Sequence, residues 1–380
     1  MYLIFLIILI LTNYARNGSS EKLTEDENNE IQQICGLSGS KPNIRKTMNT
    51  ENIGKYNNNN KTRKKNRKYE RKVMNGNKAN IRQAPWSVAV TNIGKDKEYW
   101  CSGTLISSRH VLTSTHCFLI ANKEKNVYEW KYDMTQLSRE LCDNNDVEVP
   151  EDMFATIRLN TVCQNSKICE KARKKERFVE RSSSKIWLLN VCNDNITNEF
   201  SRDDIAIIEL DSDVEFTKTV EPACVTSHIN DSQLGGKIEL YGYGDDPTEN
   251  SVNRGILKYE TCQICECKTM NASDNIDWLC SKSVGYKNQL ACTGDSGGGG
   301  MTCVDNRTTI IGILSRSPAC DINRHSKAVD YYAPVIQYNR KICLYTGVCT
   351  SEYIPTLTHS SSIPSILHPF LVLFVVFLLF

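Results

Sequence analysis

The sequence contains no apolar run long enough to cross a bilayer, no internal repeat and few stretches with helical periodicity. A membrane-spanning helix needs ~20 apolar residues, whereas the apolar runs at residues 2–11 and 369–380 are clearly shorter. The missing repeat excludes a solenoid. Apolar residues make up 40 % of the chain and charged residues 24 %, so a polytopic membrane protein and wholesale disorder are excluded as well.

Cysteine, by contrast, is abundant, with 17 residues in a chain of 380. In a reducing compartment so many cysteines would remain free thiols or bind metals, so the composition favours a secreted protein with disulfides. The run at residues 2–11 supports this interpretation because it has the length of a signal-peptide core, although no Lys or Arg precedes it. We therefore expect a signal peptide at residues 1–16 and a secreted, extracellular protein.

The C-terminal residues 351–380 show the pattern of a glycolipid (GPI) attachment signal. Three small residues at 360–362 (SSS) precede a spacer and the uncharged run 369–380, and no Lys or Arg follows. The alternative is a hydrophobic tail that stays in place. We expect the anchor, so that the protein contacts a membrane only through this end.

Charge is distributed unevenly along the chain. Residues 61–72 (KTRKKNRKYERK) hold eight basic residues and one Glu, a net charge of +7, so the remainder of a chain with a total of +2 carries −5. A mildly acidic body predicts no nucleic-acid partner. Residues 17–72 are polar and have almost no apolar periodicity, which indicates a mostly disordered pro-segment that ends in a basic linker.

From residue 73 onward, short β-rich runs alternate with turn residues, for example at 86–90, 205–210 and 309–315. Many short strands and few helical patterns predict an all-β protein with an antiparallel barrel or sandwich architecture. Asn-x-Ser/Thr sequons, which are expected glycosylation sites in a secreted protein, occur here at Asn195, Asn230, Asn271 and Asn306.

The sharpest chemical signal is the glycine-rich segment 292–300 (CTGDSGGGG). The flanking glycines allow Ser296 to lie exposed on a tight turn, with the amides of Gly294 and Ser296 pointing to one spot. Two convergent N–H donors stabilise the oxyanion that develops in acyl transfer. This segment therefore predicts a serine nucleophile.

A serine hydroxyl needs a base, and the base needs a group that orients it. The chain has only six His, and His116 lies at the end of an apolar run beside Cys117, whose bridge to Cys101 would hold the imidazole in place. Asp204 precedes the apolar run 205–210, where a partly desolvated carboxylate needs a partner. A buried structural His and an Asp that caps a strand are the alternatives for each residue taken alone.

These three segments, in the order His, Asp, Ser, resemble the chymotrypsin-like (trypsin-fold) serine proteases over about residues 73–341. The resemblance implies two packed antiparallel Greek-key β-barrels within a protease domain at 73–350. The interval from His116 to Asp204 is about twice the family interval. We assign the excess to a disulfide-braced insertion at about 121–200.

The resemblance also implies the roles of the site residues. His116 is the general base, Asp204 orients it and Ser296 is the nucleophile. The oxyanion hole is formed by the amides of Gly294 and Ser296. Ser315 is retained from the family pattern and is expected to hydrogen-bond Asp204.

Activation by cleavage is a further implication of the resemblance. Val73 lies at the family's distance from the Ala-Pro-Trp segment 84–86, and a basic pair ends at Lys72. Cleavage after Lys72 by an activating protease with basic specificity would free the Val73 ammonium to pair with Asp295 and so form the oxyanion hole. The alternative is that residues 61–72 are only a solvated linker.

The specificity pocket departs from the family pattern. Leu290 stands where trypsin-like members carry Asp, so a preference for Arg or Lys is not supported. Arg316 replaces an aromatic residue beside the retained Ser315, and Ser317 replaces a Gly, which implies a narrowed pocket for small or medium apolar side chains. Asp330 would restore a basic preference if a longer loop brings it to the pocket.

The cysteine pattern yields further expectations, including one leftover thiol because the total is odd. A zinc site at 262–267 is disfavoured in an oxidised chain. Cys280 is expected to bond one of Cys262, Cys265 or Cys267, and Cys303 to take another partner. By resemblance, the remaining expected pairs are Cys101–Cys117, Cys292–Cys320, the short loop Cys343–Cys349, and Cys35–Cys224, which would tether the cleaved pro-segment.

The sequence therefore predicts a secreted or cell-surface serine endopeptidase, made as a zymogen, that hydrolyses peptide bonds through an acyl-enzyme without cofactor or metal. Its expected partners are protein or peptide substrates, an activating protease and serine protease inhibitors. The alternative is a protease-fold binding or adhesion protein with little turnover, which the altered pocket and the glycine tract favour. An esterase is excluded because esterase triads run Ser, acid, His along the chain.

Overall fold

The computed structural model describes twelve parts of the chain: residues 22–39, 76–91, 93, 100–122, 124–163, 178–193, 203–227, 236–245, 255–267, 278–284, 291–318 and 329–350. The predicted signal peptide, the cleavage site after Lys72 and the C-terminal tail lie outside these parts. Within them, no helix is both long enough and apolar enough to cross a membrane.

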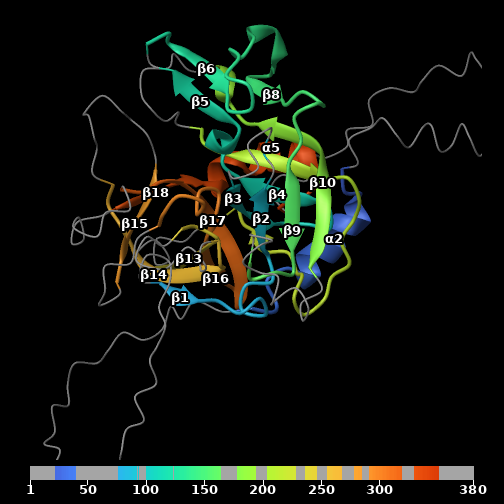
Figure 1. Ribbon diagram of the computed structural model, residues 1–380. Coiled ribbons are helices and arrows are strands. Elements are labelled where there is room, and N and C mark those ends of the chain that lie inside the picture. Colours follow the sequence, from blue (N-terminus) through green and yellow to red (C-terminus); the bar gives the residue numbers. More distant parts are fainter. Residues whose placement is uncertain are drawn as a thin grey trace, which may run out of the picture.

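Six antiparallel strands close the first barrel (Figure 1). Their spatial order is β2, β3, β4, β11, β10, β9 and back to β2. Every residue of β2 and β11 is buried, so these two strands are covered on both faces. The strands are β2 (Ser87–Thr91), β3 (Trp100–Leu105), β4 (His110–Thr113), β9 (Thr156–Leu159), β10 (Val179–Leu188) and β11 (Ala206–Leu210).

The second barrel repeats this topology. Its spatial order is β13, β14, β15, β18, β17, β16 and back to β13. In both barrels the fourth strand along the chain returns beside the first, which is the Greek-key arrangement. The strands are β13 (Lys237–Gly242), β14 (Lys258–Cys265), β15 (Leu279–Ser283), β16 (Gly299–Val304), β17 (Arg307–Arg316) and β18 (Asp330–Pro334).

The predicted all-β fold of two antiparallel barrels is therefore confirmed. The barrels meet where β16 contacts β3 and β13 contacts β2. A hydrophobic cluster runs across this junction and includes Trp86 from the first barrel and Tyr241 from the second, whose rings meet edge to face. The two barrels thus pack on a shared core, and residues at their junction come from distant parts of the sequence.

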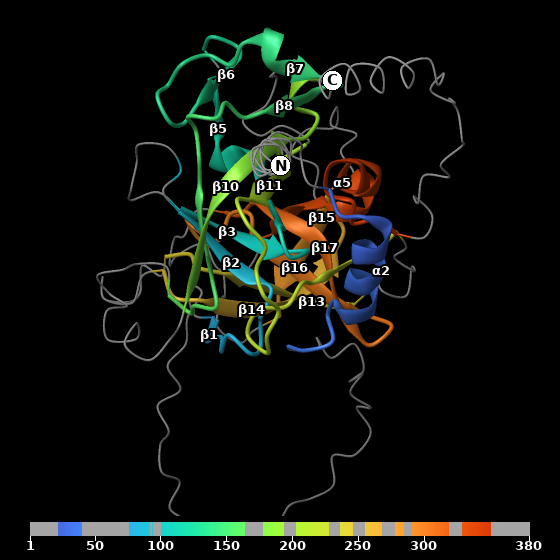
Figure 2. The same ribbon diagram turned by 90° about the vertical axis from the view of Figure 1, so that its right-hand side faces the viewer.

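The expected insertion at 121–200 is only partly correct. Because β9 and β10 lie within this range and close the first barrel, the added chain is shorter than expected. Its described part forms an extension above the barrels in Figure 2, and the disulfide Cys142–Cys192 joins it to the chain after β10. The elements of this extension are β5 (Leu119–Asn122), β6 (Val127–Trp130), η2 (Arg139–Leu141), β7 (Cys142–Asp143) and β8 (Asp146–Glu148).

The expectation of a mostly disordered pro-segment is wrong for residues 22–39. Helix α2 (Glu25–Ile34) starts with a capping box in which Thr24 and Glu27 bond each other's backbone amides. Its buried side chain Ile31 packs into the shared core. Figure 2 shows α2 beside α5 (Asn339–Thr346), and Asn28 exchanges hydrogen bonds with the backbone of Cys349. These contacts order the segment.

The remaining elements are short. Strand β1 pairs with β14, and β12 runs parallel to β17. Their bounds are β1 (Asn77–Lys78), β12 (Cys224–Val225), η1 (Thr115–Cys117), η3 (Val191–Asn193) and η5 (Val335–Tyr338).

Most of the expected disulfides are present in the described residues. Cys280 takes Cys267 as its partner, which removes Cys267 from any zinc set. Cys292 is disulfide-bonded, but its expected partner Cys320 lies outside the described residues. The expectation for Cys303 is wrong, because three described cysteines rather than one remain thiols, namely Cys262, Cys265 and Cys303. The confirmed pairs are Cys35–Cys224, Cys101–Cys117 and Cys343–Cys349.

Candidate active site

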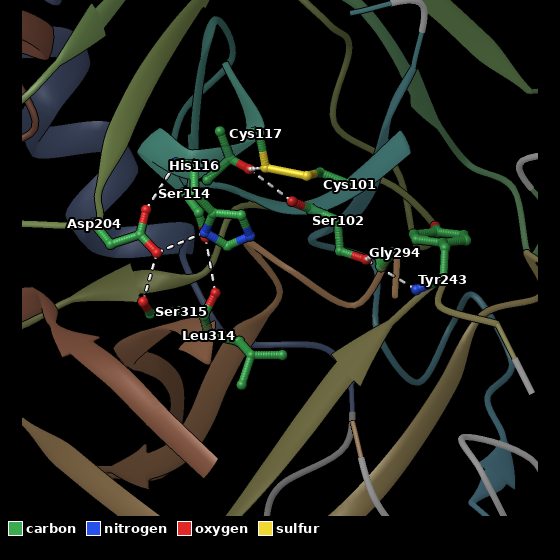
Figure 3. Close-up of a disulfide and its surroundings, with 11 residues drawn as sticks. Cys101, Ser102, Ser114, His116, Cys117, Asp204, Tyr243, Gly294, Leu314 and Ser315 are labelled. Carbon is green, nitrogen blue, oxygen red and sulfur yellow. Dashed lines mark hydrogen bonds and ion pairs between the residues drawn. A yellow bond between two sulfur atoms is a disulfide. The ribbon is translucent and has the colours of Figure 1, made fainter. Parts of the chain in front are cut away.

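His116 and Asp204 meet at the junction of the barrels (Figure 3). His116 Nδ1 lies 2.6 Å from Asp204 Oδ2, and the backbone N–H of His116 donates to Asp204 Oδ1 at 2.8 Å. The disulfide Cys101–Cys117 anchors η1, which carries His116. The imidazole is 21 % exposed whereas the Asp204 side chain is 3 % exposed, so the imidazole is accessible from solvent while its partner is shielded from water.

The environment of Asp204 keeps it ionised. Burial raises the pKa of Asp204, but the His116 imidazole, the Ser315 hydroxyl and the His116 amide together outweigh burial and hold this pKa below its ordinary value. Ser315 Oγ donates to Asp204 Oδ2 at 2.5 Å, as expected. The neighbouring Asp203 points elsewhere and accepts from Tyr338. The acid of the site is therefore Asp204.

The Ser296 turn is pressed against the strand that leads to His116. The backbone N–H of Ser102 on β3 donates to the Ser296 carbonyl at 2.8 Å. Gly297 has φ +80°, and a Cβ there would collide with Thr113 Oγ1 and lie 3.0 Å from the Ser114 amide. Because Ser296 precedes this contact by one residue and His116 follows Ser114 by two, the backbone of the Ser296 turn lies close to the backbone that leads to His116.

The backbone that carries the expected oxyanion donors is held from both barrels. Gly294 has φ +94°, a conformation that glycine adopts without penalty. Ser102 Oγ donates to the Gly294 carbonyl at 2.8 Å and accepts from the Tyr243 amide at 2.9 Å, as the dashed lines in Figure 3 show. A second hydrogen bond links the two barrels, because the Ser114 hydroxyl donates to the Leu314 carbonyl at 2.8 Å.

Asp295 is buried behind this turn and is 1 % exposed. Its carboxylate accepts from the Gly244 amide at 2.7 Å and from the Cys292 amide at 2.9 Å. Burial raises the pKa of Asp295 to about 6, although both amides and the Lys258 ammonium act to lower it. Its expected partner Val73 and the expected cleavage site at Lys72 lie outside the described residues, so the activation pair stays a prediction.

The expected pocket residues are partly described. Leu290 lies outside the described residues. The Arg316 guanidinium lies 5.9 Å from the centre of the Trp278 ring and 5.8 Å from that of the Tyr331 ring. Arg316 therefore makes cation–π contacts with two aromatic side chains. Asp330, the first residue of β18, is only 2 % exposed, so its carboxyl lies in the interior of the second barrel.

Asp330 belongs to a buried acidic cluster with Glu260 and Cys262. Their ligand atoms all lie within 4.8 Å of one another, the spacing of a group able to hold a cation. Burial and the repulsion from Asp330 raise the pKa of Glu260, and burial raises the pKa of Asp330 to about 7, although the Ser317 hydroxyl opposes this. The cluster therefore binds protons in the folded protein near neutral pH.

A pH dependence of stability follows from Asp330. The pKa of this carboxyl is about 3.8 in the unfolded chain and about 7 in the folded protein. Its contribution to the stability of the native state is therefore fully present below pH 4 and is lost as the pH rises towards 7. Asp330→Asn should therefore leave stability unchanged at pH 4 and raise it at pH 8, measured as urea midpoints. The exposed control Asp305→Asn should change neither value, and equal midpoints for Asp330→Asn and wild type at pH 8 would contradict the account.

Sequence reasoning missed several residues of the site. Ser102 could not be predicted, because nothing in the neighbouring sequence indicates that it hydrogen-bonds the backbone of the turn at Gly294. Lys131, which lies in the extension, is close to Asp204. Burial lowers the pKa of Lys131 to about 8, and the charge of Asp204 opposes this effect. His110, by contrast, is a structural histidine that contacts Ser107, and burial beside Arg109 lowers its pKa to about 3.

Two Greek-key barrels with a buried carboxylate and an imidazole bonded at their junction are the architecture of the chymotrypsin-like serine protease class. Comparison with known families agrees, because the model of the nematode trypsin-6-like family matches residues 1–349. The chain belongs to this family.

Curated relatives include two proteins that are named as proteases. The chain is 28 % identical over 255 residues to "Trypsin-like protease try-5" of Caenorhabditis elegans, covering 62 % of this chain and 74 % of that protein. It is 26 % identical to "Phenoloxidase-activating factor 3" of Holotrichia diomphalia, covering 66 % of each. It is 25 % identical to "CLIP domain-containing serine protease B14" of Anopheles gambiae, covering 64 % of each. The match thus spans about two thirds of the insect relatives.

Proposed function

We propose that this chain is a secreted serine endopeptidase, made as a zymogen, that cleaves protein or peptide substrates through an acyl-enzyme. The observation that carries the proposal is the ionised, buried Asp204 bonded to both the imidazole and the amide of His116, beside the turn of Ser296. Such a carboxylate orients the imidazole and stabilises it when it becomes charged. The altered pocket is compatible with this chemistry because it changes none of these groups.

The proposed reaction has two halves. Ser296 Oγ attacks the scissile carbonyl while His116 Nε2 takes the hydroxyl proton, and the resulting oxyanion is stabilised by the amides of Gly294 and Ser296. Collapse breaks the C–N bond, and His116 passes its proton to the leaving amine. Water then attacks the acyl-serine by the same route, with His116 as base, and restores the hydroxyl of Ser296.

Hydrolysis of a peptide library tests this function against the alternative of a binding or adhesion protein. The chain cleaved after Lys72 should release new peptide ends, detected by mass spectrometry, and the Ser296→Ala variant cleaved at the same site should not. The products also report the pocket, since ends after small apolar residues support a narrowed pocket and ends after Arg or Lys support a role for Asp330. A correctly cleaved, folded protein that yields no products favours the binding protein.

We further propose that the pro-segment stays attached after activation. Cys35, which follows α2, is bonded to Cys224 of the protease domain, and Arg109 joins Glu27 of α2 to Asp213. Two relatives are named "Phenoloxidase-activating factor" 1 and 3, which supports another protein as the substrate. By analogy, an activating protease with basic specificity is expected to cut the linker, and serine protease inhibitors are expected to stop the product.

The tether gives a direct prediction. Wild-type protein cleaved after Lys72 should migrate as one species on a non-reducing denaturing gel and as two after reduction. The variant Cys35→Ser/Cys224→Ser should give two species on both gels. The control Cys142→Ser/Cys192→Ser lacks a different disulfide and should behave as wild type. A single non-reduced band for the Cys35→Ser/Cys224→Ser variant would contradict the tether.

Extracellular localisation rests on the disulfides and the sequence pattern at both ends. Asn306 is exposed in the turn between β16 and β17, which is compatible with glycosylation. The other expected sites, Asn195, Asn230 and Asn271, lie outside the described residues. If the C-terminal signal adds a glycolipid, phosphatidylinositol-specific phospholipase should release the protein from the cell surface, and retention would contradict the anchor.

A further inference from the structure

A lysine is buried in the interior of the second barrel. Lys258 is fully buried, and among the described residues it is the only Lys or Arg with no exposed surface. It lies on β14 directly opposite Gly242 of β13. Directly paired residues of antiparallel strands point to the same face of the sheet, with Cβ positions ~5 Å apart. Lys258 therefore lies next to the group that fills the space where a side chain on Gly242 would be.

That occupant is the carboxylate of Asp295. A Cβ on Gly242 would collide with Asp295 Oδ1, and a Cβ on Gly244 would collide with the same group. The carboxylate thus fills the place of the missing Gly242 side chain, and Lys258 is paired with Gly242 on the neighbouring strand, beside this place. The charges are close enough that the Lys258 ammonium lowers the pKa of Asp295 against the effect of burial.

Asp295 is also the acid in this interior that is best prepared to be ionised. Asp295, Glu260 and Asp330 repel one another, so a single buried cation can balance only one of them. Asp295 is held by two backbone N–H donors from the oxyanion turn and its neighbour, Cys292 and Gly244. Burial raises the pKa of Asp295 to about 6, and these two amides and the Lys258 ammonium oppose that rise.

We propose that Lys258 is an internal counter-charge for Asp295 that holds the oxyanion turn in its working form before the chain is cleaved. This inference rests on the proposed function. A carboxylate buried without a cation is costly, and the Val73 ammonium arises only after cleavage at Lys72, whereas Lys258 is part of the barrel at all times. The uncleaved zymogen therefore keeps part of the activity of the cleaved enzyme.

The test uses the full chain made uncleavable by Arg71→Ala/Lys72→Ala, and it measures the rate of labelling by a fluorophosphonate. The uncleavable protein should be labelled at a rate within about tenfold of the cleaved wild type, a difference of ~1.4 kcal/mol in the barrier. Adding Lys258→Met should slow labelling of the uncleavable protein by about 100-fold, the effect of losing an oxyanion donor. In the cleaved protein the same substitution should slow labelling far less, because the Val73 ammonium serves Asp295 there.

The controls separate a charge effect from a folding effect. Met is used because its side chain is similar in length to that of Lys but carries no charge. The control variant Lys237→Met, at an exposed position of β13, should change neither labelling rate. An equal loss from Lys258→Met in cleaved and uncleavable protein would show a merely structural role and overturn the inference. Uncleavable protein labelled no faster than Ser296→Ala would overturn it without any Lys258 variant. Cleaved wild type that is not labelled would instead overturn the proposed function, and the inference with it.

Discussion

Ser296→Ala is expected to lower kcat/KM for peptide hydrolysis by about 10⁴- to 10⁶-fold, and His116→Ala by a similar factor. The two side chains act as one unit, because the hydroxyl is a poor nucleophile until the imidazole takes its proton. The double variant should therefore be no slower than the slower of the two single variants. The measurement is kcat/KM of each cleaved variant on one peptide from the library.

The exposed Ser212→Ala is the matched control for this experiment, since the Ser212 hydroxyl lies on the surface of the first barrel and donates to the neighbouring Asp211. It should retain wild-type kcat/KM. A double variant whose loss equals the product of the two single losses would mean that Ser296 and His116 contribute independently. That outcome would contradict a shared proton transfer.

Asp204→Asn is expected to lower kcat by about 10⁴-fold with little change in KM. An amide group facing His116 Nδ1 can donate to it, which favours the tautomer with the proton on Nε2. His116 then cannot accept the Ser296 proton. The geometry should survive, because the side-chain oxygen of the new amide can still accept the backbone N–H of His116 that Asp204 Oδ1 accepts in the wild type.

The neighbouring Asp203 provides a close control for this prediction. Asp203 is also buried, but it accepts from Tyr338 and Asn190 rather than from His116. Asp203→Asn should therefore change stability more than kcat. Comparable losses of kcat in the two variants, with both proteins folded by near-ultraviolet circular dichroism, would contradict the assignment of Asp204 as the orienting acid.

The main outline of fold and site could be predicted from the sequence because its signals are local. The string around Ser296 is contiguous, and His116 and Asp204 each adjoin an apolar strand, so that their segments match a known pattern without knowledge of the packing. The same holds for Cys101–Cys117, whose members flank one hairpin. Each of these features depends on a few residues that are close in the sequence.

What the sequence did not reveal depends on contacts between distant residues. Helix α2 had a readable signal in the capping box of Thr24 and Glu27, but the polar composition of residues 17–72 obscured it. Lys258 resembles any strand lysine until its pairing with Gly242 places it against Asp295. Strand β10 lies in the long interval between His116 and Asp204 that was assigned to an insertion, although its pairing with β9 and β11 closes the barrel.

The central claim is that Ser296 is a nucleophile activated at the junction of the two barrels. The most direct test treats the chain cleaved after Lys72 with a fluorophosphonate and locates the adduct by peptide mass spectrometry. The account predicts one phosphonyl group per chain, on Ser296, that is lost when His116 is replaced by Ala. An adduct on another side chain, or no adduct on a folded chain that begins at Val73, would contradict it.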